Sequence, residues 1–287
     1  MKKNGITVII SCQDDHKTLR DCVESFLLFG DELIIVTNRA TIETSNLAKK
    51  LSIEYNSKVT YIDAPHAKDL YQNRQVGLNH ANYCWVMRCD ADYIAYENCD
   101  GKNSIQYLRD YILRLKPIWP TAIFISKVSL SLGWDKMYEI EKDDIAQLKY
   151  IPSVYTGKKE ARIYSQNPFL CFRRLGRWEG VPWIKWYRKI RINKPYWFEV
   201  TIRDSEALLF RKARTDWRQL GDFKNYPELA DYIKNIFLPN EYPGLSIKSA
   251  AKKYIEDEVF PKIKPYDEKK YFPLPSRIKS KQSSKCE

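Results

Sequence analysis

The chain has 287 residues and a mass of 34.0 kDa, enough for one large domain or a core domain with an appendage. Hydrophobic residues make up 44% and charged residues 29%, which excludes disordered and collagen-like chains. The seven cysteines are scattered and form no CxxC pair, which excludes a disulfide framework or a zinc ribbon and favours a reducing compartment. No apolar run reaches the length of a membrane span, and we expect no cleaved signal peptide. We therefore expect a cytoplasmic protein.

The net charge of +12 is unevenly distributed along the chain. Residues 1–100 carry 11 Lys and Arg against 14 Asp and Glu, a net of −3. The remaining 187 residues carry 37 basic against 22 acidic side chains, a net of +15. A strongly basic second part indicates a phosphate-bearing partner, which could be nucleic acid, a phospholipid surface or a phosphorylated small molecule. A Lys-rich surface that serves only solubility is the alternative.

Strand and helix patterns alternate over the first hundred residues. Apolar, β-branched runs predict strands at 6–10, 33–36, 59–62 and 83–87, and helical spacing predicts helices at 17–29, 44–51 and 73–82. This alternation predicts a parallel, doubly wound sheet with right-handed crossovers. Ligands of such sheets bind beyond the carboxyl ends of the strands. The stretches to inspect are therefore those that follow the strands, at 11–15, 37–39, 63–67 and 88–92.

The remainder of the chain is less regular. We expect a helix at 103–116, a strand at 122–128, a long loop at 143–159 and helices at 229–237 and 247–259. Residues 162–218 hold 14 Lys and Arg and five Trp, a mixture that suits a phosphate-bearing acceptor, an anionic membrane face or single-stranded nucleic acid. The last segment is rich in Lys, Pro and Ser, and we expect it to be a loose tail.

Asp90 and Asp92 directly follow the fourth predicted strand. Two carboxylates at positions i and i+2 of a turn can point at one cation, and Mg²⁺ or Mn²⁺ prefers such hard oxygen ligands. D-x-D is short enough to occur by chance in many chains. Its position at the carboxyl edge of the predicted sheet makes a metal site the stronger interpretation.

Several segments resemble a known family. Ile6–Ser11, Leu19–Phe26 and Asp31–Val36, followed by the helix Asn73–Ala81 and by the D-x-D at 90–92, resemble the opening of family 2 glycosyltransferases with the GT-A fold. Phe172-Arg173-Arg174 followed by Trp178-Glu179-Gly180 is similar to a WEG stretch of bacterial members that build lipopolysaccharide cores or glycosylate peptides. The resemblance covers residues 4–95 well and 165–220 loosely.

The resemblance implies an α/β protein of the GT-A class, with a Rossmann-like, mostly parallel sheet flanked by helices and a helical C-terminal extension. Residues 1–218 would form the glycosyltransferase domain, with a nucleotide-sugar half at 1–100 and an acceptor half at 101–218. Residues 219–287 would form the helical extension and basic tail.

The resemblance also implies transfer of a sugar from a nucleotide-sugar donor, with inversion at the anomeric carbon. Asp90 and Asp92 would hold a divalent cation, Mn²⁺ or Mg²⁺, against the diphosphate. The nucleotide would be bound by residues at the strand ends, namely Ser11, Gln13, Thr37, Arg74 and Asp90. Glu179 would be the general base that takes the proton of the acceptor hydroxyl.

The sequence departs from the family pattern at several positions. Thr37 stands where members commonly have an Asp that reads the nucleobase, and Pro182-Trp183 stands where members have His-Glu. A late His that serves as a third metal ligand is missing, and Asp204 or Glu206 could replace it or be surface carboxylates. Glu179 could instead pair with a nearby arginine. The base would then be sought among Asp135, Asp143, Asp144 and Asp204.

The leading hypothesis for the acceptor is a surface polysaccharide or lipopolysaccharide. Such an acceptor would be an anionic, phosphorylated or lipid-linked glycan, met either in the cytoplasm or at the membrane periphery. One alternative is a glycosyltransferase that acts on modified bases of nucleic acid, which the basic second part permits. Another is a basic binding protein that kept the fold and lost catalysis, although the presence of Glu179 and both D-x-D carboxylates argues against it.

Overall fold

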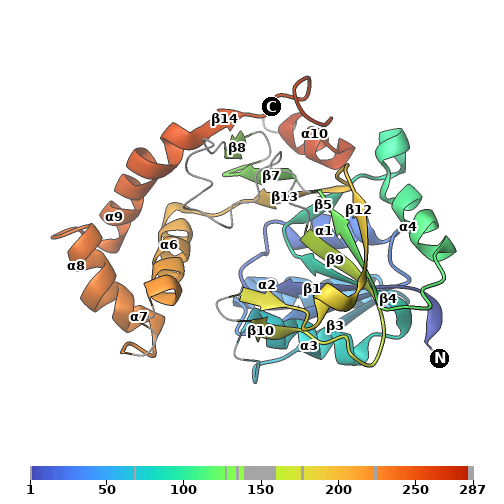
Figure 1. The fold of residues 1–287 in the computed structure, drawn as a ribbon. Helices are drawn as coiled ribbons and strands as arrows, with labels where there is room; N and C mark the ends of the chain where they lie inside the picture. The colour runs from blue at the N-terminus through green and yellow to red at the C-terminus, as the bar shows by residue number, and fades with distance from the viewer. Residues whose placement is uncertain are drawn as a thin grey trace.

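The computed structural model describes residues 2–283 except 68, 127, 134–135, 139–159, 176–177, 221 and 223–224. Its centre is a seven-stranded sheet in which six strands run in the same direction and one strand runs against them (Figure 1). In spatial order the strands are β12 (Arg188–Ile192), β6 (Thr121–Ile125), β9 (Glu160–Ser165), β4 (Tyr83–Asp90), β1 (Lys3–Cys12), β2 (Glu32–Thr37) and β3 (Val59–Asp63). The antiparallel strand is β9, which lies between β4 and β6. The expected α/β class with a mostly parallel sheet is confirmed.

Alternate residues of the central strands face opposite helical layers. Val8 and Ile10 pack in a core cluster with residues of α1 (Leu19–Phe26), α2 (Ile42–Glu54) and α4 (Ile105–Arg114). Ile9 belongs to the cluster on the other face, which is covered by α3 (Leu70–His80) and the segment 170–187. Burial on both faces explains why these strands are continuous apolar runs rather than alternating ones.

Helix α3 lies unusually close to the sheet. A Cβ atom added at Gly77 would stand 2.4 Å from Cγ2 of Ile9 on β1, so a side chain at this position would push the helix outward. The first turn of α3 is fixed as well, because the buried Asn73 side chain donates a hydrogen bond of 2.9 Å to the Val36 carbonyl of β2. The first residues of α3 are therefore held at the carboxyl ends of β1 and β2.

A second, smaller sheet and a helical unit follow the central sheet. The smaller sheet has the order β14 (Ile263–Pro265), β8 (Lys136–Tyr138), β7 (Val128–Ser131), β13 (Trp197–Thr201) and β5 (Tyr93–Ala95). The helical unit consists of α6 (Ser205–Leu220), α7 (Leu229–Tyr232), α8 (Leu238–Glu241) and α9 (Ile247–Tyr254); a π-helical turn joins α7 to α8, and another follows α9. It has a core of its own around Leu209, Phe237 and Ala250. Figure 1 shows α6 beside α9, standing apart from the central sheet. Because α6 begins at Ser205, the boundary expected at 218/219 falls inside this helix.

The expectation of a loose C-terminal tail is wrong for the described residues. The tail forms β14 and α10 (Ser276–Ser283), and its Leu274 and Ile278 are buried beside strands of the smaller sheet. The guanidinium of Arg277 donates hydrogen bonds to Glu24 at 2.8 Å and to Glu97 at 2.9 and 3.1 Å, and it lies 3.3 Å from Asp21. The Lys- and Ser-rich composition suggested a loose segment, but two buried apolar side chains, Leu274 and Ile278, and the partly buried Arg277 hold it against the rest of the protein.

Among the described residues, no helix combines the length and apolarity that crossing a membrane requires.

The Arg277 contacts predict a measurable contribution to stability. Arg277→Gln leaves three partly buried carboxylates without their shared cation, and we expect the free energy of unfolding to fall by about 1.5–3 kcal/mol. Lys279→Gln is the matched control, since Lys279 and its partner Glu268 are far more exposed and such a pair contributes at most about 1 kcal/mol. Urea denaturation followed by circular dichroism measures both. Equal losses in the two variants would show that the tail is not docked in solution.

Candidate active site at the carboxyl edge of the sheet

The register of the central strands gathers the predicted site residues at one edge. Ser11 of β1 lies opposite Asp90 of β4 on one side and Val36 of β2 on the other. The next residue of β1, Cys12, is opposite Thr37. These are the last positions of three parallel strands, so the structure brings Ser11, Thr37 and Asp90 to the edge where ligands of such sheets bind.

Asp90 lies between two buried arginines. Arg74, from the first half of α3, contacts Asp90 Oδ1 through its Nη2. Arg162, from the antiparallel strand β9, donates a hydrogen bond of 3.0 Å to Asp90 Oδ2. Both guanidinium groups are buried, whereas the Asp90 side chain is partly open to solvent. Charge-assisted hydrogen bonds of this kind are short and directional, so the two arginines fix the orientation of the Asp90 side chain.

Asp92 lies two residues further on and has the opposite environment. It is only 8% exposed, and its Oδ1 has no hydrogen-bond partner among the described residues. Burial raises the pKa of Asp92 well above its ordinary value, and the nearby carboxylates of Glu199, Asp90 and Asp15 raise it further. A buried carboxyl group with an unpartnered oxygen, surrounded by negative charge, suits a divalent cation. The residues present therefore fit the metal that the D-x-D motif predicts.

Two further carboxylates border Asp92. Asp15 follows β1, and its Oδ2 accepts a hydrogen bond of 2.9 Å from the backbone N–H of Gln13. Burial raises the pKa of Asp15, although the Gln13 hydrogen bond and the Arg203 guanidinium, 3.6 Å away, lower it. Glu199 of β13 accepts a hydrogen bond of 2.8 Å from the Ser129 hydroxyl. Within the described part of the chain, no three His, Cys, Asp or Glu side chains form a complete metal-binding group, so substrate or water oxygens would complete the coordination.

Unpartnered polar atoms concentrate at this edge. In the described part of the chain, ten buried side-chain oxygen or nitrogen atoms lack a hydrogen-bond partner. Six of them lie at or beside the ends of β1, β2 and β4, namely Ser11 Oγ, Asn38 Oδ1, Asn73 Oδ1, Asp92 Oδ1, Tyr93 OH and Arg162 Nε. Because buried polar groups are normally paired, such a concentration marks a place where a polar ligand or its bound water completes the hydrogen bonding.

Thr37 lies beside a carboxylate that the sequence analysis did not place there. The Thr37 hydroxyl donates to Asp63 Oδ1 at 3.1 Å and lies 3.0 Å from the Tyr61 hydroxyl, both on the neighbouring strand β3. A carboxylate from β3 is therefore joined to the position where the family commonly has Asp. Gln13 is exposed at the same edge, and the nearby Arg39 has a left-handed backbone with φ of 49°. Such strain in a residue other than glycine is typical of binding loops.

Glu179 is placed only by its backbone. It lies in β11 (Trp178–Gly180), opposite Arg174 of β10 (Arg173–Leu175), and this hairpin packs against α3, the helix that carries Arg74. Its side chain is outside the described part of the structure, as are the alternative bases Asp135, Asp143 and Asp144. Asp204 accepts a hydrogen bond of 2.8 Å from the Ala207 amide at the start of α6 and thereby caps that helix, while Glu206 is exposed.

The sequence analysis assigned no role to three residues of the site, namely Arg162, Glu199 and Asp15. Arg162 and Glu199 lie in the less regular second half, and they reach Asp90 and Asp92 only because β9 and β13 return beside the first-half strands. Asp15 lay within an inspected stretch, but nothing in its neighbours distinguished it. The signal for Arg162 in the sequence is weak, because its strand β9 (Glu160–Ser165) also holds the charged Glu160 and the polar Ser165.

The pKa of Asp92 predicts how its replacement changes stability. A carboxyl group whose pKa is raised on folding binds its proton more tightly in the folded state, so the folded state is progressively disfavoured as pH rises above about 4. Asp92→Asn removes this penalty. We expect the melting temperature of the cation-free variant to exceed that of the wild type by a margin that grows between pH 4 and 8. Differential scanning fluorimetry across this range, with EDTA present, measures the margin. A margin independent of pH would show that Asp92 is not a buried, raised-pKa acid.

Comparison with known proteins gives one family and several distant structures. Residues 7–110 match the model of glycosyl transferase family 2. No curated protein is significantly similar to the chain. The structure is similar to that of S. aureus TarS residues 1–349 in complex with UDP-GlcNAc, at 13% identity and a TM-score of 0.47. It is also similar to the mannosyltransferase PcManGT from Pyrobaculum calidifontis in complex with GDP-Man and Mn²⁺, at 12% identity and a TM-score of 0.49.

The extent of these matches differs. The alignment with TarS covers 75% of this chain and 65% of that one, and the alignment with PcManGT covers 100% and 82%. Similarity at this identity concerns the arrangement of the chain and not its substrates. The match to the family model runs from β1 to α4, and it contains the predicted site residues Ser11, Thr37, Arg74, Asp90 and Asp92. Residues 7–110 of this chain are thus similar to glycosyl transferase family 2.

Proposed function

We propose that the chain is a cation-dependent, inverting glycosyltransferase that transfers a sugar from a nucleotide-sugar donor to a surface-polysaccharide or lipopolysaccharide acceptor. The observation that carries the proposal is the contrast between the two D-x-D carboxylates. Asp90 is fixed by two buried arginines, while Asp92 is buried with an unpartnered oxygen in an acidic surrounding. One carboxylate is thus oriented, and the other has an oxygen with no hydrogen-bond partner among the described residues, within a region that matches a glycosyltransferase family.

The proposal assigns each edge residue a part in donor binding. The divalent cation, held through Asp92 with Asp90 beside it, supplies positive charge to the diphosphate. Arg74 orients Asp90, and Ser11 and Gln13 line the edge where the nucleoside would lie. Thr37 joins the same edge together with Asp63 of β3, so the pair can offer both a hydroxyl and a carboxylate to a base or a ribose.

The reaction needs one proton acceptor besides the cation. Glu179 would take the proton of the acceptor hydroxyl as its oxygen forms a bond to the anomeric carbon. The bond from that carbon to the diphosphate breaks at the same time, and the nucleoside diphosphate leaves with the electron pair. Attack from the face opposite the leaving group inverts the configuration. The support for this role is the WEG resemblance and the packing of the β10–β11 hairpin against the helix that bears Arg74.

The proposed acceptor is anionic or phosphorylated. Residues 101–287 carry a net charge of +15, and the arginines of the β10 strand, Arg173 and Arg174, are exposed on the side of α3. Basic side chains around an acceptor site favour phosphate-bearing glycans. The proposal includes no base-specific contact to nucleic acid, because nothing in the described part of the structure provides one.

The first experiment tests donor binding. We expect UDP or GDP with Mn²⁺ to raise the melting temperature of the wild type, because a ligand that binds only the folded state stabilises it by mass action. The same nucleotide with EDTA should have little effect, and Asp92→Asn should remove the cation-dependent increase. Asp231→Asn, the same chemical change at an exposed position of α7, is the control. A nucleotide shift that is the same with Mn²⁺ and with EDTA would contradict the metal role of Asp92.

The second experiment tests the base. Glu179→Gln keeps the size of the side chain but cannot accept a proton, and we expect kcat to fall by about 10²–10⁴-fold. Donor affinity should change little, because the base contacts the acceptor. Product release of the nucleoside diphosphate, measured over time in the presence of acceptor, gives kcat, and the thermal shift above gives donor binding. A variant that retains wild-type kcat would exclude Glu179, and the search would pass to Asp135, Asp143 and Asp144.

A further inference from the structure

Three loops meet at the edge of the central sheet opposite the candidate active site. Residues 117–120 precede β6, residues 183–187 precede β12, and residues 166–172 follow the antiparallel strand β9. This topology places all three at the amino ends of the parallel strands. They are also in contact, since the Trp119 indole donates a hydrogen bond of 2.9 Å to the Trp186 carbonyl, and Asn167 donates one of 3.3 Å to the Tyr187 hydroxyl.

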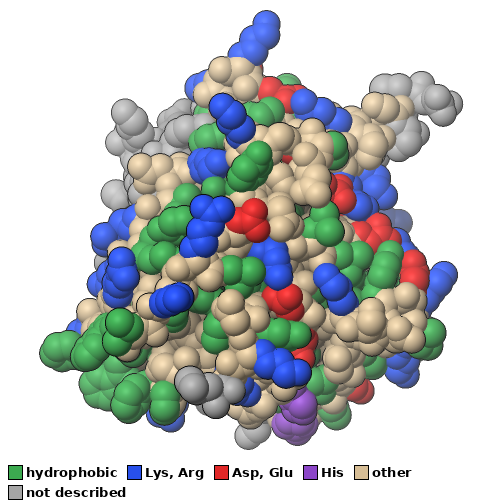
Figure 2. Space-filling model, turned by 90° about the vertical axis from the view of Figure 1, so that its right-hand side faces the viewer, with side chains coloured by type: hydrophobic (Ala, Val, Ile, Leu, Met, Phe, Trp, Pro, Cys, Tyr) green, Lys and Arg blue, Asp and Glu red, His purple; other side chains and the backbone are tan. Residues whose placement is uncertain are grey.

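The tips of these loops expose large apolar side chains. Ile118 is 99% exposed, and Trp183 and Trp186 are each 64% exposed. The full group, which we call the amino-edge patch, consists of Ile118, Trp119, Phe169, Trp183 and Trp186. Figure 2 shows the side of the molecule that bears the N-terminus in Figure 1, and hydrophobic side chains gather there at one lower corner, with Lys and Arg side chains nearby. Contiguous exposed apolar surface of this kind marks an interaction site.

The backbone of the patch is strained in a way that favours exposure. Trp183 adopts the left-handed conformation, with φ of 64° and ψ of 10°. This conformation is unfavourable for a bulky side chain, whereas Asn or Gly adopts it readily. Here it precedes the short helix Ile184–Trp186 and leaves the indole in solvent. Strained residues that gain nothing from packing are typical of binding surfaces.

The charge around the patch is entirely positive along its own segments. Residues 111–126, 161–175 and 180–198 contain no Asp or Glu. The exposed cations beside the aromatic side chains are Lys116, Lys185, Arg188 and Lys189. Lys185 lies over the ring of Trp186, with its Nζ 5.4 Å from the ring centroid. Arg188 and Lys189 begin β12, which is the edge strand of the central sheet.

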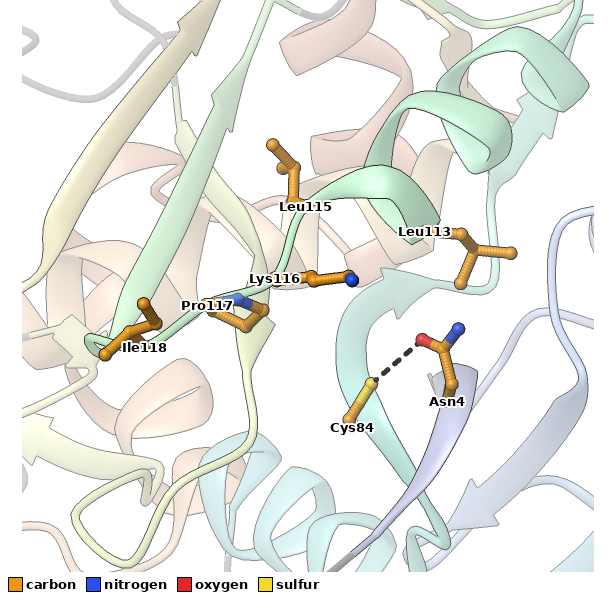
Figure 3. A pocket seen from close by; sticks show the side chains of 7 residues that line it. All are labelled: Asn4, Cys84, Leu113, Leu115, Lys116, Pro117 and Ile118. Carbon is orange, nitrogen blue, oxygen red and sulfur yellow. Dashed lines mark hydrogen bonds between the residues drawn. The ribbon is translucent and has the colours of Figure 1, made fainter.

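A pocket continues the apolar surface. It has a volume of about 320 Å³ and is lined by Asn4, Cys84, Leu113, Leu115, Lys116, Pro117 and Ile118 (Figure 3). Asn4 and Cys84 begin β1 and β4, so the pocket opens at the same amino edge. Its walls are mostly aliphatic, and the side chain of Lys116 is exposed to solvent.

We propose that the amino-edge patch docks the protein on the surface of an anionic lipid bilayer. Tryptophan is favoured at the boundary between headgroups and acyl chains, and Lys and Arg beside it attract anionic headgroups. A second copy of the chain is disfavoured as the occupant, because a symmetric contact would place these cations against one another. The exposed rings of the patch also suit stacking on unpaired bases, but Ile118, which is 99% exposed, and the aliphatic pocket beside it are surfaces that acyl chains cover and bases do not.

The test is sedimentation of the full chain with vesicles. Vesicles of phosphatidylcholine with one third phosphatidylglycerol are compared with vesicles of phosphatidylcholine alone. We expect the wild type to bind the anionic vesicles at least about tenfold more tightly and to lose that preference as salt is raised. The double variant Ile118→Ser/Trp183→Asn should weaken binding by at least about tenfold, and Asn suits the left-handed backbone at 183. The double variant Lys185→Glu/Arg188→Glu should abolish the preference for anionic vesicles.

Matched controls come from α2, where Ile53 is 75% exposed and Lys49 and Lys50 are exposed. Ile53→Ser and Lys49→Glu/Lys50→Glu should bind vesicles as the wild type does. Circular dichroism and the ligand-free melting temperature of all variants check that the fold is intact, so the result does not depend on the proposed enzymatic activity. The proposal is overturned if the patch variants bind like the controls. It is also overturned if they abolish a dimer seen by sedimentation velocity, or binding of a single-stranded oligonucleotide, without changing vesicle binding.

Discussion

The interaction on which the site depends is the pairing of Asp90 with the two buried guanidinium groups of Arg74 and Arg162. It ties three elements, since α3, β4 and β9 each contribute one of the three side chains. Removing one partner would leave a buried charge without compensation, which is strongly destabilising. The same pairing fixes the turn that begins at Asp90, and therefore fixes where Asp92 lies. The geometry of the edge follows from this one contact.

The site is built at the expense of stability. Asp92 is held beside Glu199, Asp90 and Asp15, whose charges raise its pKa, while the Arg211 guanidinium lowers it. A chain selected only to fold would place an apolar residue or an amide at this position. Ser11, Asn38 and Asn73 also lower stability, because each buries a polar atom without a hydrogen-bond partner where an apolar side chain would leave none unpaired. Functional sites are where such local rules are broken.

Features that arise from neighbouring residues could be predicted from the sequence, and contacts between residues far apart in the chain could not. The strands and helices of residues 6–90 were predictable, because their apolar periodicity is local and the helix Asn73–Ala81 resembles a family motif. The partnership of Arg162 with Asp90 was not, because it joins residues 72 positions apart through a strand inserted against the sheet direction. The docked tail was missed because Leu274 and Ile278 are two apolar residues in a Lys-rich segment, too few to form a periodic pattern. The roles of Glu179, Ser11, Gln13 and Thr37 remain predictions.

The placement of the two functional edges on opposite ends of the same strands has a consequence for reach. Strand β4 runs from Tyr83 beside the pocket to Asp90 at the candidate active site, and eight residues of extended chain span about 26 Å. A protein seated on a bilayer through its amino edge would hold Asp90 and Asp92 at up to about that height, turned toward the aqueous phase. Glu179 lies four residues before Trp183 of the patch, so at most about 14 Å of chain separates the two. The proposed base would therefore stand between the bilayer and the cation site, and an acceptor rooted in the same bilayer would approach the donor from the membrane side.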